Sequence, residues 1–199
     1  IVTAMIKLIK SFPTEISYYS HQKQTKISQI NTVTAIEMLG ELGDTRAVDT
    51  LVETLNNKLV VQESVRALRI IGDERAIEAI IQSMEYTINQ RNENSYYRSW
   101  SQTGPARWRG LNEFAKALGK MGNLESIKIL VKGFDIESSR LSEIEKMSVV
   151  EAISKILKRA KLDSKERENI IKFLTNEDTS LRAMGNSLLK GILNDAKME

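Results

Sequence analysis

The residue types that most often carry out catalysis are scarce in this chain of 199 residues. It has one histidine, His21, and no cysteine. A hydrolytic triad needs a histidine base that a third group orients, and nothing in the sequence suggests such partners for His21. Thiolate and His-Glu metal sites lack their ligands, and the acidic residues fall mostly at exposed helical positions, where solvated charge is the expected role. The sequence therefore predicts a protein that is not an enzyme and holds no metal or cofactor.

Side chains suited to binding gather in residues 93–109. Both tryptophans of the chain lie there, among tyrosines and arginines. These residue types dominate the hot spots of protein interfaces, and they also stack on bases or pair with phosphates. The candidate partner-binding residues are Tyr96, Tyr97, Arg98, Trp100, Arg107, Trp108 and Arg109. Three roles stay open: a partner-binding loop, aromatic side chains packed back on the fold, and a nucleic-acid contact in which Arg91 also takes part.

A repeated junction indicates which elements position these side chains. Residues 39–48 reappear as residues 68–77 and again as residues 118–127, at shifts of 29 and 50 residues. In each copy an apolar helical period leads to a glycine, and a second period follows at once. We expect the glycine to end its helix in the left-handed conformation and the next residue to cap the following helix. The glycines are Gly43, Gly72 and Gly122, and the capping residues are Asp44, Asp73 and Asn123.

Stacked helix pairs predict an all-α fold, an α-α superhelix in the form of a right-handed solenoid of about four to five antiparallel pairs. We assign residues 1–43 to N-terminal helices, residues 44–92 to two regular repeats and residues 93–109 to an inserted loop. Residues 110–199 hold a third repeat, a degenerate fourth and a C-terminal capping helix. Only two prolines interrupt the chain, and 41% of its residues are hydrophobic, which fits one continuous helical domain.

The unit Leu-Gly-x-Leu-Gly-Asp-x-Arg-Ala, at a period of about 30 residues, resembles the short HEAT-like repeats first associated with phycobilisome lyases. The resemblance is close at residues 35–55 and 67–81 and fair at residues 115–134. It implies a polar ladder between neighbouring repeats, formed by Asp44 with Arg46 and by Asp73 with Arg75. The third copy departs from this pattern, with Asn123 and Glu125 instead. A lyase-like or chaperone-like role toward a tetrapyrrole is implied by the resemblance alone.

In such a solenoid the second helices line the concave face, and their outward positions differ in charge from repeat to repeat. The equivalent pairs are Asp49 and Glu53, Glu78 and Gln82, and Lys128 and Lys132. The groove would grade from acidic to basic. A nucleic-acid backbone requires cationic side chains along its whole track, whereas a folded protein can match a graded surface. This pattern favours a protein partner, with purely solubilising charge as the alternative.

Composition supports the same picture. The net charge is +3, with charges of both signs interspersed, and no apolar stretch is long enough for a membrane span. We therefore expect a cytoplasmic, non-catalytic scaffold that binds another protein through its concave helix face and the insertion. Nucleic-acid binding through Arg91, Arg98, Arg107 and Arg109, with stacking on Trp100 and Trp108, is the alternative.

Overall fold

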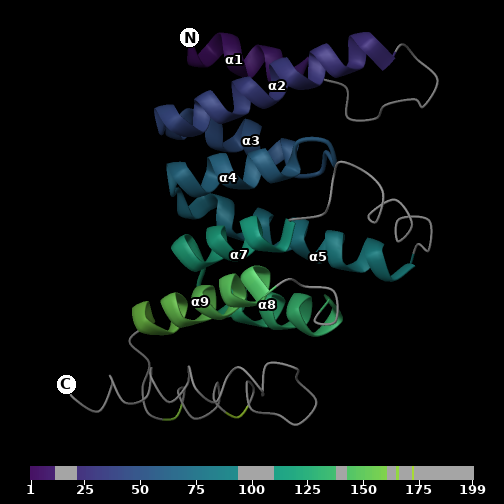
Figure 1. The fold of residues 1–199 in the computed structure, drawn as a ribbon. Helices are drawn as coiled ribbons and strands as arrows, with labels where there is room; N and C mark the ends of the chain where they lie inside the picture. Colours follow the sequence, from purple (N-terminus) through teal and green to yellow (C-terminus); the bar gives the residue numbers. More distant parts are fainter. Residues whose placement is uncertain (12–21, 94–109, 138–142, 161–164, 166–171, 173–199) are drawn as a thin grey trace. The chain divides into compact units, whose positions relative to one another are not determined.

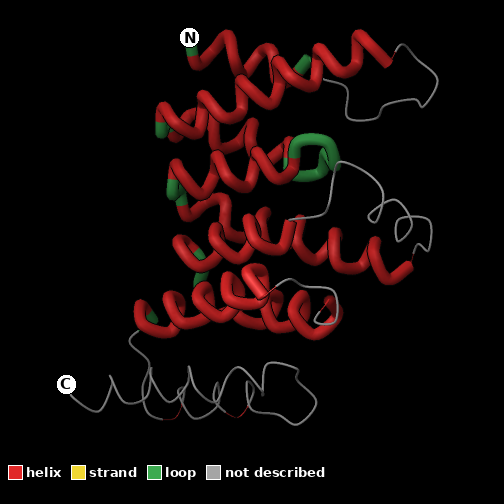
Figure 2. Tube along the Cα trace, in the orientation of Figure 1, coloured by secondary structure: helices red, strands yellow, loops and turns green. Residues whose placement is uncertain are grey.

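The computed structural model describes residues 1–11, 22–93, 110–137 and 143–160, together with Lys165 and Lys172. Throughout these residues the regular elements are helices, and none is a strand (Figure 2). The prediction of an all-α fold is confirmed. His21, residues 94–109 of the insertion and the predicted C-terminal capping helix lie outside the described residues.

The chain divides into two compact units, Ile1–Ser83 and Met84–Glu199, and the division falls within one helix. The elements that begin in the first unit are α1 (Val2–Lys10), α2 (Gln22–Leu42), the short 3-10 helix η1 (Thr45–Ala47), α3 (Val48–Thr54), α4 (Val61–Ile71), a second 3-10 helix η2 (Glu74–Ala76) and α5 (Ile77–Glu93). Beyond α5, the second unit has α7 (Gly110–Met121), α8 (Leu124–Glu137) and α9 (Glu143–Arg159). Helix α5 ends one residue beyond the bound that we assign to the second regular repeat.

Each unit is held together by contacts between the first helices of successive helix pairs. In the first unit α2 packs on α4, and α3 fills the space beside α4. In the second unit α7 packs on α9, and α8 lies beside α9. The side chains that these helices direct inward are fully buried, among them Ile36, Leu39, Leu51 and Leu68 in the first unit and Phe114, Leu118, Leu130 and Ile156 in the second.

A glycine and an aspartate make the first two junctions as expected. Gly43 and Gly72 have φ values of 65° and 78°, in the left-handed region that glycine adopts without a steric penalty. Asp44 then accepts a hydrogen bond from the backbone N–H of Arg46 at 2.9 Å, and Asp73 repeats this arrangement. The chain passes through η1 or η2 before the second helix begins, so the cap acts on a 3-10 turn.

The third junction is built differently, and the prediction of a left-handed Gly122 is wrong. Only Gly43 and Gly72 have a positive φ among the described glycines. A Cβ on Gly122 would collide with the carbonyl oxygen of Leu118 and lie 2.6 Å from Oγ of Ser126, so glycine is needed here for space. Asn123 Oδ1 accepts from the backbone N–H of Ser126 at 3.2 Å, and Ser126 Oγ accepts from the N–H of Asn123 at 3.1 Å. The predicted cap at Asn123 is therefore present, as one half of a reciprocal capping box.

Glycine also sets the closest approach of the first helices. A Cβ on Gly40 would lie 2.8 Å from Cα of Ala67, and a Cβ on Gly119 would lie 2.9 Å from Cα of Ala152. Thus α2 meets α4, and α7 meets α9, at a contact between a glycine and an alanine. The same geometry recurs in both units.

Candidate protein-binding surface

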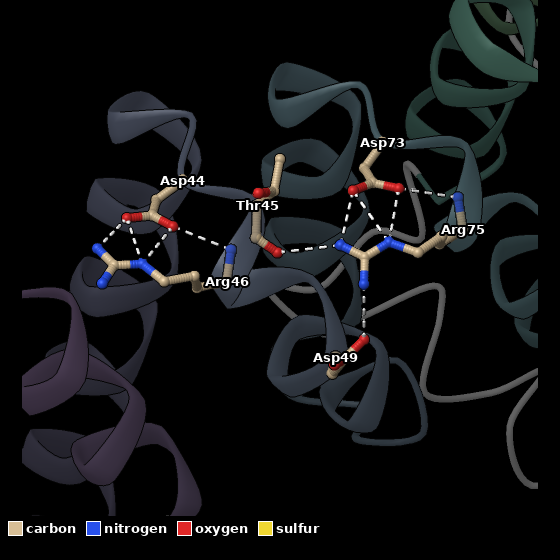
Figure 3. A network of polar contacts seen from close by, with 6 residues as sticks. All are labelled: Asp44, Thr45, Arg46, Asp49, Asp73 and Arg75. Atoms are coloured by element: carbon tan, nitrogen blue, oxygen red, sulfur yellow. Dashed lines mark hydrogen bonds and ion pairs between the residues drawn. The ribbon is translucent and has the colours of Figure 1, made fainter.

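Two Asp-Arg pairs lie at the first two junctions (Figure 3). Arg46 Nε donates to both carboxylate oxygens of Asp44, at 3.0 and 3.1 Å, and its Nη2 donates at 2.5 Å. Arg75 binds Asp73 in the same way, with Nη2 at 2.8 Å. Each arginine is therefore held in a fixed orientation by an aspartate that also caps the following helix.

Arg75 reaches beyond its own junction to the preceding repeat. Its Nη2 donates to the backbone carbonyl of Thr45 at 3.3 Å, and its Nη1 lies 3.7 Å from Oδ1 of Asp49. Figure 3 shows its guanidinium between Asp73, Thr45 and Asp49. The ladder that the family resemblance implied is thus seen at Arg75, whereas the contacts of Arg46 within the described residues are with Asp44.

These pairs stay charged at physiological pH. Hydrogen bonds from the side chain and backbone of Arg46 lower the pKa of Asp44 from 3.8 to about 2. Hydrogen bonds from Arg75 lower the pKa of Asp73 in the same way, and the pKa of each arginine is raised by its aspartate. Because neither partner titrates near neutral pH, the pairs serve to join elements rather than to move protons.

The four candidate residues of the first unit all lie on exposed positions. The side chains of Asp49 and Glu53 on α3 are 85% and 62% exposed. Glu53 lies 3.6 Å from Nζ of Lys10 on α1, an ion pair that the sequence analysis missed because Lys10 belongs to no repeat. On α5, Gln82 Nε2 donates to Glu78 at 2.9 Å. Each candidate therefore has a partner within the unit.

In the second unit the candidate residues are lysines on α8. Lys128 forms an ion pair with Glu125 on the same helix at 2.9 Å. Lys132 lies 2.8 Å from Glu85 on α5, so this pair joins two helices. Glu85 was also missed by the sequence analysis, although it follows Glu78 by two helical turns. Whether the acidic and basic groups form one graded groove stays a prediction.

Exposed ion pairs of this kind contribute only about 0–1 kcal/mol each, so a charged partner can replace them at small cost. In the described part of the chain, no group of three or more metal-ligating side chains could hold a metal ion. Within the same residues, no helix is both long and apolar enough to cross a membrane. Tyr96, Tyr97, Arg98, Trp100, Arg107, Trp108 and Arg109 lie outside the described residues.

Comparison with known proteins identifies the repeat. Residues 28–93 match the family model of the HEAT repeats, from within α2 to the end of α5, a stretch that contains both Asp-Arg junctions. No curated protein matches the chain. HEAT repeats are generally protein-interaction scaffolds and are typically not catalytic. The match does not extend to the phycobilisome-lyase type in particular. Helix pairs, Gly-Asp junctions and the match together identify residues 28–93 as HEAT-like repeats, and they support a HEAT-like repeat protein.

Proposed function

We propose that the chain is a non-catalytic scaffold that binds another protein through the outward sides of its second helices and through residues 93–109. In the first unit the relevant surface is the acidic face, which we define as Asp49, Glu53, Glu78 and Gln82 on α3 and α5. The observation that carries the proposal is that these side chains are exposed while their neighbours Leu51 and Ile80 are fully buried. The buried side of each helix builds the core, and the charged side is left for a partner.

Contacts within the first unit hold the acidic face in place. Ser83 Oγ on α5 donates to the carbonyl of Leu55 at 3.0 Å, which fastens α5 to the end of α3. Arg75 joins the start of the second repeat to Thr45 and Asp49 of the first. A surface held in place by such contacts loses little conformational entropy on binding, so more of the interaction energy appears as affinity.

The charge of each face indicates what it would bind. The acidic face fits a basic patch of a partner, and Lys128 and Lys132 on α8 fit an acidic one. In this proposal the Arg and aromatic side chains of residues 93–109 supply further contacts of the hot-spot type. A cytoplasmic partner fits the sequence composition.

Matched charge reversals test the proposal. The variant Glu53→Lys/Glu78→Lys inverts the acidic face, whereas Glu37→Lys/Glu41→Lys changes two exposed carboxylates on the first helix α2. Proteins captured from the source cell by all three forms would be compared by quantitative mass spectrometry, and the recovered partner titrated against each. We expect the acidic-face variant to bind about tenfold more weakly or worse and the control to bind like the wild type. Equal affinities for the two variants would refute the assignment of this face.

The concentration of arginine and tryptophan in residues 91–109 supports a second candidate, sequence-tolerant binding of nucleic acid. Its contacts would be Arg91, Arg98, Arg107 and Arg109, with bases stacked on Trp100 and Trp108. Labelled single and double strands should then bind at about 50 mM salt and dissociate steeply toward about 200 mM. An absence of binding at the lower concentration would remove this candidate.

A further inference from the structure

Two helices, α4 and α9, each contact the first helix of the preceding pair through an alanine. In α4, Ala67 lies against Gly40 of α2, and it is 1% exposed. In α9, Ala152 lies against Gly119 of α7, and it is 2% exposed. An isoleucine follows each alanine after one helical turn, Ile71 in α4 and Ile156 in α9. At both contacts the residue that lies against the preceding first helix is therefore a buried alanine, and an isoleucine stands four positions later.

The same positions in α2 are exposed. The shift of 29 residues between the first two repeats places Met38 of α2 at the position of Ala67, and Leu42 at the position of Ile71. Met38 is 44% exposed and Leu42 is 55% exposed. The positions of α2 that are equivalent to Ala67 and Ile71 thus carry two large apolar side chains in contact with solvent.

The neighbouring helix α1 adds to this surface. It packs on α2 and touches α3, as α3 packs on α4, so it occupies the place of a second helix that precedes α2 (Figure 1). Ile9 is buried on its inner side, whereas Leu8 is 41% exposed. We define Leu8, Met38 and Leu42 as the end face of the first unit.

We propose that the end face binds an amphipathic α-helix, which lies along α2 and α1 as α2 itself lies along α4. Single exposed apolar residues are common on protein surfaces and need no explanation. Here the repeat register gives one for Met38, because the equivalent alanines, Ala67 in α4 and Ala152 in α9, are each covered by a helix. The bound helix would present an apolar stripe with a small residue opposite Met38, as α2 presents Gly40 to Ala67. This site is separate from the acidic face and is tested independently of it.

A suitable probe is a peptide of residues 28–43, which holds the C-terminal part of α2 with Gly40 and the glycine that follows the helix. A hydrocarbon staple between positions 34 and 38, which are both exposed in α2, keeps the isolated peptide helical without covering Gly40. Binding of the fluorescein-labelled peptide to the whole chain is measured by fluorescence anisotropy. We expect saturable binding, which Gly40→Leu in the peptide weakens by about tenfold because the bulky side chain prevents close approach.

Variants of the whole chain locate the site. Met38→Glu/Leu42→Glu should weaken peptide binding about tenfold or more, and the uncharged Met38→Ala/Leu42→Ala should weaken it in the same direction. The matched control is Ile144→Glu/Met147→Glu, which introduces two acidic groups at exposed apolar positions of α9, 71% and 65% exposed. Unchanged circular dichroism and melting show that each variant is folded.

Three results would overturn the proposal. The first is the absence of peptide binding up to about 1 mM, a concentration at which even weak helix docking is detected. The second is an equal loss of binding in the α9 control. The third is a wild-type dimer that the substitutions Met38→Glu/Leu42→Glu dissociate. The last result, read by light scattering, would identify a second copy of the chain as the occupant instead of a separate helix.

Discussion

Replacement of Gly40 by alanine tests the contact on which the stacking of α2 and α4 depends. The added Cβ would lie 2.8 Å from Cα of Ala67 and 2.9 Å from its Cβ, distances that require something to shift. Because Cα is part of the backbone, the two helices must move apart, and no side-chain rotation relieves the clash. Overpacking of this kind costs about 1–3 kcal/mol, and we expect the upper half of that range. Alanine favours the helix over glycine by about 1 kcal/mol, so the net loss of stability is about 1–2 kcal/mol.

Urea and thermal unfolding followed by far-ultraviolet circular dichroism measure this loss. For a chain of this length it corresponds to a fall in Tm of roughly 2–8 °C. Asn31→Ala on the exposed side of α2 is the control, since it gains helix preference without a clash and should leave stability equal or slightly higher. Gly119→Ala should repeat the effect against Ala152. A Gly40→Ala variant that is more stable than the wild type would refute the close contact, because only the gain in helix preference would then remain.

The remaining predictions concern the junctions. Arg46→Met should raise the pKa of Asp44 from about 2 part of the way to 3.8, since the backbone N–H at position 46 still donates; a carboxyl NMR titration measures it. This depressed pKa stabilises the fold above about pH 4, and the contribution is lost as the pH falls toward about 2. Asp44→Asn should therefore reduce the fall in the free energy of unfolding between about pH 4 and about pH 2, measured by urea unfolding. Gly72→Ala, at φ 78°, should cost about 1 kcal/mol in the same assay, and wild-type stability would argue against the left-handed turn. Arg159→Met should cost about 1.5 kcal/mol, because its guanidinium donates at 2.6 and 2.8 Å to two carbonyls at the end of α7; an unchanged midpoint would contradict this.

The candidate site was only partly accessible to sequence reasoning. The charges at Asp49 and Glu53 can be placed on the outward side of a helix because helical periodicity is a local property. Their pairing with Arg75 and Lys10 depends on how neighbouring helices are aligned, which no local pattern expresses. The end face is a similar case, since the repeat register becomes informative only when the exposed fraction of Met38 is known.

The sequence alone determines where the helices of the repeats end and begin. Glycine and aspartate at a junction act through backbone conformation and through hydrogen bonds that span two to four residues, so Gly43 and Asp44 could be interpreted without a fold. Gly122 shows the limit of that rule. A side chain there would collide with Leu118 and Ser126, whereas its φ is not in the left-handed region. Only the tertiary structure decided which residues touch between repeats, such as Gly40 with Ala67. Such contacts depend on the shapes of side chains far apart in sequence, which come together only when whole helices pack.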